Sequence, residues 1–553
     1  MKFINKAFLV GLSVMLPVAA CDTDELHNRN KNPQAYLEFP MEYLFTAAEL
    51  GTASNGSGGD NWYLHGRTNI GYCAYAIQQL STAGTQGGIF PGDRYTDNVE
   101  SYNAPWEWLY SDQLKNLAEV IRQTSPDGFD SHKNNLRQAA RILRVFNFQR
   151  LTDFYGNIPY TQALDGLAGN MLPEYDTQET IYNGMLEELE QATAALTPNT
   201  GSEVDAAFGS ADLIYNGDTD KWKRMGYSLM LRLAMRISNV APAKANEYVQ
   251  KAVAGGVFQS NDDNAWVGMA LGPSQWANKN GLSRHYREQN QATTLSKTFI
   301  DELMGPDKGS VADDDPRLFV FSQGIAGTGG PITDPLLQKG LPNGLDQRMV
   351  NQLEGVPDNP GVNVGATYTR INIDFLQFDD PILLMNYAEA ALLLAEASER
   401  GIGGLSSATT QSYYEAGVRA AMTMYAPFDD DHVEADPGSG IDLADYDLSV
   451  SDAEVDAYLA ARPLPAGSEQ RLERIGTQIW LAHWTNWYEA WSNWRRSGYP
   501  KLTPTNYPGN VTNGTIPARL KYPEQEIATN PNYESGATLP NNVTTKLWWD
   551  VVD

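Results

Sequence analysis

The sequence predicts a mainly α-helical protein in which helices alternate with long irregular segments. Apolar residues recur at helical spacing in several long stretches, which is typical of amphipathic helices. Between these stretches lie segments rich in Gly, Pro, Asn and Asp. Aromatic residues make up 10% of the 553 residues, including 13 Trp and 28 Tyr, so the chain has ample material for a packed core.

The N-terminus has the pattern of a lipoprotein export signal. Lys2 and Lys6 precede an apolar run over residues 7–16 that is too short to span a bilayer, and small residues then lead to Cys21. This pattern predicts a signal peptide over residues 1–20, acylation of Cys21, a polar tether over residues 21–40, and a single helical domain over residues 41–553. An ordinary cleaved signal with an accidental cysteine is the alternative.

Helical periodicity is clear over residues 132–151, 180–196 and 221–238. The clearest helical hairpin joins residues 382–400 to residues 410–425 across the glycine-rich break at 401–404. Two helices joined by a short break resemble a tetratricopeptide unit, although no strict 34-residue repeat runs through the chain. Long insertions over residues 257–290, 305–380 and 426–468 separate the helical regions, and long loops often carry function.

Net charge and cysteine content argue against nucleic-acid binding and against an internal disulfide. The net charge of −28 argues against nucleic acid as a partner. Cys21 and Cys73 are the cysteines of the chain, so acylation of Cys21 leaves no internal disulfide. Cys73 falls on an apolar helical face and is expected to be a buried hydrophobic residue. A basic stripe on residues 132–151, formed by Lys133, Arg137, Arg141 and Arg144, is expected to pair with acidic neighbours.

Sequence motifs of catalysis and cofactor binding are missing. The sequence has no zinc-protease, nucleophile-elbow, Walker or dinucleotide-binding motif, and its six histidines are scattered. We therefore expect no enzymatic activity, no catalytic residue, no cofactor and no metal centre. The acidic runs 313–315 and 429–431 leave calcium open, but a solvated charge run is the better interpretation of both.

The C-terminal third carries a family signature. Residues 478–504 read QIWLAHWTNWYEAWSNWRRSGYPKLTP, residues 516–523 read IPARLKYP, and residues 544–550 read TTKLWWD. Earlier stretches at residues 150–160, 228–238 and 315–318 belong to the same pattern. Together they resemble the SusD/RagB family, in its SusD-like lipoprotein branch, over essentially the whole mature chain.

This resemblance implies a function. Members of the family are lipid-anchored outer-membrane proteins at the cell surface that capture a nutrient for a SusC-like TonB-dependent transporter. The nutrient is commonly an oligosaccharide and in some branches a peptide. The implied fold is mainly α-helical, with tetratricopeptide-like hairpins as scaffold and irregular insertions as the ligand face. A surface glycoside hydrolase, or a scaffold that binds proteins, remains the alternative.

We predict different roles for two sets of aromatic residues, one in the core and one in ligand contact. Trp480, Trp484, Trp487, Trp491 and Trp494 recur every three or four residues, which is typical of a buried helical face. Ligand contacts are expected instead from aromatic residues in or beside loops, because sugar rings pack their C–H faces on indole and phenol rings. The candidate ligand-binding residues are Trp62, Tyr95, Tyr102, Trp266, Trp276 and Tyr286.

Overall fold

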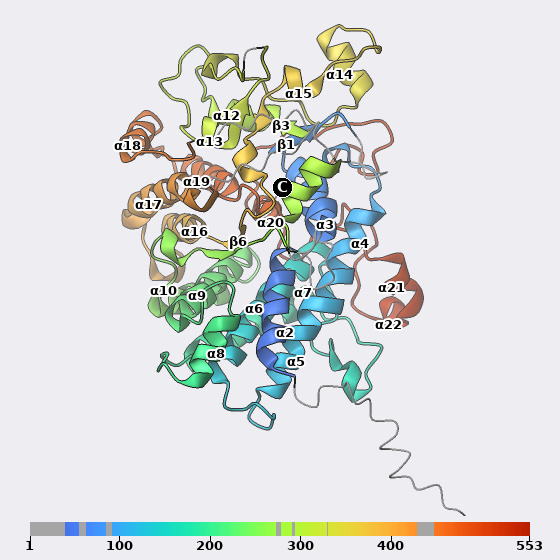
Figure 1. Ribbon diagram of the computed structural model, residues 1–553, viewed down its shortest axis with the longest axis vertical. Helices are drawn as coiled ribbons and strands as arrows, with labels where there is room; N and C mark the ends of the chain where they lie inside the picture. The colour runs from blue at the N-terminus through green and yellow to red at the C-terminus, as the bar shows by residue number, and fades with distance from the viewer. Residues whose placement is uncertain are drawn as a thin grey trace, which may run out of the picture.

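The computed structural model describes residues 39–54, 62–84, 91–272, 278–289, 293–328, 330–428 and 447–552 (Figure 1). The predicted signal peptide and Cys21 lie outside these residues. The longer helices are α2 (Met41–Ala53), α4 (Val99–Trp108), α5 (Lys115–Gln123), α6 (Asn134–Tyr155), α7 (Gln178–Ala195), α8 (Glu203–Ala211), α9 (Thr219–Arg236), α10 (Pro242–Gly255), α14 (Gln347–Glu354), α16 (Tyr387–Arg400), α17 (Thr410–Thr423), α18 (Asp452–Ala461), α19 (Ser468–Ala482) and α20 (Trp487–Ser497).

Short elements connect these helices. The short α-helices are α3 (Trp62–Leu64), α11 (Gly281–Arg284), α12 (Lys297–Leu303), α13 (Leu318–Phe321), α15 (Val364–Thr367), α21 (Glu524–Thr529) and α22 (Asn532–Ser535). Three antiparallel strand pairs join β1 (Leu80–Thr82) to β3 (Thr293–Leu295), β2 (Ala265–Val267) to β6 (Ile382–Met385), and β4 (Ser322–Gly324) to β5 (Arg370–Ile371). The predicted mainly α-helical fold class is confirmed.

Helical hairpins stack on one another to form the scaffold. Helix α6 packs on α7, α9 on α10, and α16 on α17, and further contacts link α7 to α9, α9 to α16, and α16 to α19. Figure 1 shows this succession on the left of the molecule, from α9 and α10 upward to α17 and α19. The arrangement matches the tetratricopeptide-like hairpins that the sequence predicts.

The α16–α17 hairpin shows how local sequence sets the helix ends. Asn386 caps α16 by accepting a hydrogen bond from the Glu389 amide at 2.7 Å, and Gly401 ends the helix with a φ of +67°. A helix beginning at residue 382 was expected, but Ile382–Met385 form strand β6, paired with β2. The four apolar residues of β6 are buried, and such a short run fits a buried strand as well as a helix.

The predicted tryptophan stripe forms part of the core. Trp480, Trp484, Trp487 and Trp491 are each at most 3% exposed, while Trp494 is half-buried and packs against this core. Trp484 also stacks on Phe299, with ring centroids 5.2 Å apart. Burial of this face is therefore confirmed, as is burial of Cys73.

Buried ion pairs tie the hairpins to one another and to α20. Arg232 of α9 donates two hydrogen bonds of 2.6 Å to Glu389 of α16, which joins two hairpins. Arg496 of α20 makes the same fork with Glu396 of α16, again at 2.6 Å. Bidentate pairs of this kind fix orientation as well as distance. Arg496 thus holds α20 against the scaffold, and Arg232 holds α9 against α16.

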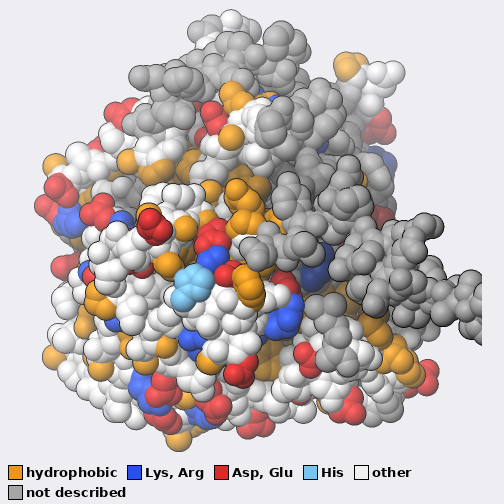
Figure 2. All heavy atoms as spheres, turned by 60° about the horizontal axis from the view of Figure 1, so that its bottom comes forward, with side chains coloured by type: hydrophobic (Ala, Val, Ile, Leu, Met, Phe, Trp, Pro, Cys, Tyr) orange, Lys and Arg blue, Asp and Glu red, His pale blue; other side chains and the backbone are white. Residues whose placement is uncertain are grey.

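Charges of both signs mix on the surface. Figure 2 turns the lower end of Figure 1 toward the viewer and shows acidic and basic side chains interspersed among small hydrophobic areas. Lys133, from the basic stripe, pairs with Glu42 at 2.9 Å and with Asp130 at 3.0 Å. Arg141 and Arg144 both pair with Glu188. Pairing with acidic neighbours is confirmed for these three residues of the stripe.

Candidate functional site

The segments that carry most of the predicted ligand residues converge on one helix, the π-helix η1 (His65–Ala74). It contacts α3, which begins at Trp62, and α4, which contains Tyr102. It also contacts the 3-10 helix η2 (Gly92–Arg94), next to Tyr95, and the π-helix η6 (His285–Gln289), which contains Tyr286. We call the region formed by α3, η1, α4, α11 and η6, most of whose described residues are buried, the loop face.

Backbone geometry sets the loop face apart from the scaffold. Three π-helical segments lie in or beside it: η1, η6, and η3 (Leu109–Leu114), which continues directly from α4. The π-helix is rare in proteins and occurs frequently at functional sites. The π-helix η1 also contributes Ile70, Tyr72 and Cys73 to the core, so the core and the loop face share this element.

The loop face contains an aromatic pair that sequence analysis missed. The rings of Tyr63 and Trp108 stack with centroids 5.9 Å apart and planes 17° apart, and both side chains are half-buried. The Arg67 guanidinium lies 4.2 Å from the Tyr63 ring centroid and pairs with Glu100 at 2.6 Å. An aromatic platform flanked by polar groups is the chemistry that binds sugar rings. Trp62, which precedes Tyr63 in the sequence, is among the predicted ligand residues, whereas Tyr63 and Trp108 are not.

A second aromatic and cationic group borders α11. Asn280, which caps α11, donates its backbone N–H to the Phe378 carbonyl at 2.7 Å. The Lys279 ammonium lies 4.1 Å and the Arg287 guanidinium 4.9 Å from the Phe378 ring centroid. Cation–π contacts hold Phe378 half-buried at this border. The Ser54 hydroxyl, at the end of α2, donates a hydrogen bond to the Lys279 carbonyl and so connects α2 to this group.

Three of the predicted ligand residues are interior side chains. Tyr95, Tyr102 and Tyr286 are 1%, 2% and 5% exposed. The Tyr102 hydroxyl donates to the Thr96 carbonyl at 3.3 Å, and the Tyr95 hydroxyl accepts the Thr505 N–H at 3.3 Å. These rings are buried in this structure, and ligand contact by Tyr95, Tyr102 and Tyr286 stays a prediction. Tertiary contacts from distant segments bury them, and such contacts leave no mark on local sequence.

The structure describes the three tryptophans among the predicted ligand residues to different extents. Trp62 begins α3 on the loop face, and its side chain lies outside what the structure describes. Trp276 falls among the residues outside the description. Trp266 is half-buried on β2 and packs edge-on against Phe428 with centroids 5.5 Å apart. Because β2 pairs with β6 and packs on α2, Trp266 is anchored to the scaffold. Ligand contact by these three residues stays a prediction.

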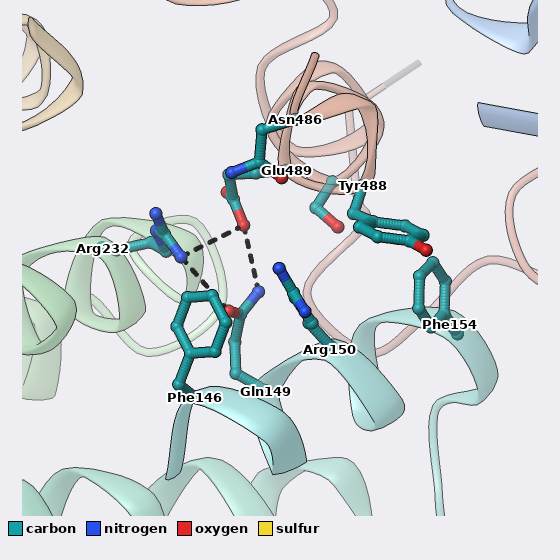
Figure 3. A pocket seen from close by; sticks show the side chains of 9 residues that line it. Phe146, Gln149, Arg150, Phe154, Arg232, Asn486, Tyr488 and Glu489 are labelled. Atoms are coloured by element: carbon teal, nitrogen blue, oxygen red, sulfur yellow. Dashed lines mark hydrogen bonds and ion pairs between the residues drawn. The ribbon is translucent and has the colours of Figure 1, made fainter. Parts of the chain in front are cut away.

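A small cavity lies between α6, α9 and α20, beside the loop face, because Tyr488 of its lining donates its hydroxyl to the Leu64 carbonyl of α3. Figure 3 shows Arg150, Arg232, Gln149 and Glu489 pointing toward one another across it. Gln149 donates to Glu489 at 3.1 Å. The cavity measures about 10 Å³, which is room for about one water molecule. It is therefore a gap in a structural charge network and not a ligand site.

The same network contains a cluster of possible metal ligands. Oxygen and nitrogen atoms of Glu389, His483 and Glu489 lie within 4.8 Å of one another, and all three residues are buried. Arg232 already bonds both oxygens of Glu389, and Arg236 donates to Glu489. Burial lowers the pKa of His483, against the nearby carboxylates, and favours the neutral ring. Guanidinium groups thus occupy the place that a cation would need.

The structure describes one of the two acidic runs, residues 313–315. Asp315 is fully buried and forms a bidentate pair with Arg317, at 2.9 and 2.6 Å. It is a structural ion pair, not a solvated charge. Asp313 and Asp314 are partly exposed. The run 429–431 lies outside the described residues.

Comparison with known proteins identifies the architecture. A SusD-like family model, described as starch-binding and associating with the outer membrane, matches residues 34–523. A solved structure described as a chitin-binding protein is 32% identical, with a TM-score of 0.72, over 93% of this chain and all of that one.

Two further solved structures cover the same shares of both chains at 25% identity. One is a SusD-like protein of Bacteroidetes AC2a, with a TM-score of 0.71. The other is a SusD homologue from Bacteroides uniformis, with a TM-score of 0.67. No curated protein matched the chain.

Proposed function

The chain belongs to the SusD-like family, and we propose that it captures an oligosaccharide at the cell surface without cleaving it. The acylated Cys21 would hold the protein on the outer membrane, and residues 21–40 would link this anchor to a single domain over residues 41–553. A SusC-like TonB-dependent transporter would receive the captured glycan. Among the described residues, no helix is both long enough and apolar enough to cross a membrane.

The observation that carries the proposal is whole-length similarity to a protein described as chitin-binding, within a family described as starch-binding. Both polymers are neutral and built from hexose rings. A chain with a net charge of −28 suits a neutral ligand better than an anionic one. We therefore take soluble chitin fragments as the first candidate ligand and starch fragments as the second.

The loop face supplies suitable chemistry for such a ligand. Tyr63 and Trp108 present a stacked aromatic surface, and Arg67 with Glu100 adds a donor and an acceptor beside it. We propose this group as the centre of the ligand site, with Trp62 and Trp276 as further contacts from the adjoining segments. Trp266, packed on Phe428, would contribute only from the edge of the site.

A non-catalytic role agrees with the described polar groups. A glycoside hydrolase needs two carboxyl groups about 5–9.5 Å apart across the glycosidic bond. At the aromatic platform, Glu100 is engaged in its ion pair with Arg67. The buried Glu389 and Glu489 are engaged by arginines in the interior. Capture followed by transport needs none of these groups to exchange protons.

Calorimetric titration tests the proposal. The mature protein should bind hexamers of N-acetylglucosamine or of glucose saturably, with no release of shorter sugars. Tyr63→Ala and Trp108→Ala should each weaken binding about threefold to tenfold, because a stacking ring is worth about 0.5–1.5 kcal/mol. Tyr43→Ala is the matched control. Tyr43 is 64% exposed and pairs with Phe39 at the start of α2.

Each contrary result has a separate meaning. Unchanged binding in both loop-face variants would remove Tyr63 and Trp108 from the site. Binding of peptides in place of glycans would favour the peptide-capturing branch of the family. Sugar release that disappears on changing one carboxylate would favour a surface hydrolase.

A further inference from the structure

A groove with a mixed polar and apolar lining lies apart from the aromatic platform, at the end of the molecule that Figure 1 draws at the top, near α12 and α14. Three segments form its walls: the first turns of α12, residues 342–349, and residues 503–506. Its volume is about 410 Å³, which falls in the range of roughly 300–1,000 Å³ typical of small-molecule sites.

Buried side chains hold two of these walls together at the groove floor. Gln78 is 2% exposed and donates its side-chain amide to the Thr503 carbonyl at 2.5 Å. Its side-chain oxygen accepts the Thr298 hydroxyl at 2.8 Å. Gln78 therefore ties α12 to residues 503–506. Its φ of +58° lies in the left-handed region, which an ordinary residue adopts only when its surroundings demand it.

Asp93 holds the third wall in the same way. It is 1% exposed and accepts hydrogen bonds from the Asn343 side chain and the Gly344 N–H, both at 2.9 Å. The Asp93 carbonyl accepts the Thr505 hydroxyl. One buried residue thus binds residues 342–349 and residues 503–506 at once, and the groove needs no rearrangement to exist.

The close approach of these two walls depends on Gly344. Its φ is +75°, and a Cβ atom there would lie 2.6 Å from the Thr505 Cβ. A larger residue would push residues 503–506 away from the loop and strain the backbone. The groove is therefore a preorganised shape, and preorganisation lowers the entropic cost of binding.

The groove lining indicates a neutral ligand rich in hydroxyl groups. Lys297 and Asp301 pair with each other at the groove edge, so their charges compensate. Hydroxyl and amide groups of Thr298, Thr505 and Asn506 line the walls beside them. Apolar surface comes from residues such as Met349, against which the C–H faces of a sugar ring can pack.

We propose that this groove is a second glycan-binding site, which takes one or two sugar residues of a neutral oligosaccharide. The ligand class rests on the proposed function, but the location is independent of the aromatic platform. Two sites on one surface protein would hold separate parts of a long glycan and so raise the overall affinity.

Calorimetric titration with the N-acetylglucosamine and glucose hexamers, on the full mature protein, tests this. The variant Lys297→Ala/Asp301→Ala removes the charged pair at the groove edge, and Met349→Trp fills the groove. The matched control is Glu247→Ala/Lys251→Ala. It removes another exposed Lys–acid pair at the same helical spacing, on α10. Circular dichroism should show that every variant is folded.

Trp108→Ala weakens the aromatic platform and so provides a background in which the contribution of the groove is easier to measure. Residual binding of this variant should fall about fivefold or more when Lys297→Ala/Asp301→Ala is added, since two lost polar contacts are worth about 1–3 kcal/mol. Met349→Trp, which occupies the groove, should weaken the residual binding at least as much. The α10 control added to the same background should change nothing.

The outcomes separate the two proposals. A single wild-type site that Trp108→Ala abolishes and the groove variants leave intact would overturn the groove and leave the proposed function standing. Binding lost in the groove variants but intact in Trp108→Ala would support the groove and remove the platform. If neither glycan binds, both proposals fall.

Discussion

Replacing Trp487 by alanine should destabilise the fold without touching the ligand site. Trp487 is 3% exposed, and its indole N–H donates to the Gln79 side-chain oxygen at 2.7 Å. Truncating a buried tryptophan costs roughly 3–5 kcal/mol, and the Gln79 oxygen left without a partner adds about 1 kcal/mol or more. The expected loss of at least about 4 kcal/mol is a large part of the roughly 5–15 kcal/mol that stabilises a typical domain.

Urea unfolding followed by circular dichroism measures this loss. Trp494→Ala is the matched control, since Trp494 lies on the same stripe, is half-buried, and donates to the Pro500 carbonyl at 3.1 Å. It should cost about half as much, because less apolar surface is exposed by its removal. If Trp487→Ala unfolds at the wild-type urea concentration and instead loses its glycan, the stripe faces a groove and the assignment of core and site is reversed.

Three further perturbations probe the anchor, a buried ion pair and a helical hairpin. Cys21→Ala should release the protein from membranes or leave its signal uncleaved, as fractionation would show; unchanged membrane association of a processed variant would refute acylation. Burial would raise the pKa of Glu396, but Arg496 and Arg400 lower it to about 2. The ionised Glu396 therefore adds about 3 kcal/mol to the free energy of unfolding. This contribution is fully present above the unfolded pKa of about 4.3 and is lost as the pH falls through 2. Glu396→Gln should flatten part of the decline in melting temperature between pH 5 and pH 2, and an unaltered decline would contradict this. Gly417→Val should cost about 1–3 kcal/mol, because a Cβ at Gly417 lies 2.5 Å from the Leu392 Cγ; a wild-type melting temperature would show that α16 and α17 have room to part.

Sequence periodicity predicts features that depend on a single helix. The basic stripe follows one helix, α6 with its N-cap Lys133, so spacing alone places its side chains on a common face. The tryptophan stripe instead runs from α19 through a turn at residues 483–486 into α20, a break that its regular spacing does not show. The hairpin of α16 and α17 is visible from periodicity as well, with Gly401 marking the break. The strand β6 is not predictable in this way, because its partner β2 lies more than a hundred residues away.

Burial that depends on distant segments stays hidden from the sequence. Tyr95 has loop-like neighbours in the sequence. Residues near Thr505, which are distant in sequence, nevertheless contact and enclose it in the fold. Glu489 lies within the tryptophan signature, but nothing in its spacing shows that Arg236 of α9 faces it. The stacked pair of Tyr63 and Trp108 likewise joins two separate helices, so neither residue alone indicates a ligand surface.

Direct titration of the mature protein with hexamers of N-acetylglucosamine and of glucose tests the central claim most simply. The account predicts saturable binding of at least one of them, weakened by Trp108→Ala, with the sugar recovered intact. Absence of binding to both, or conversion of either into shorter sugars, would contradict a role in glycan capture.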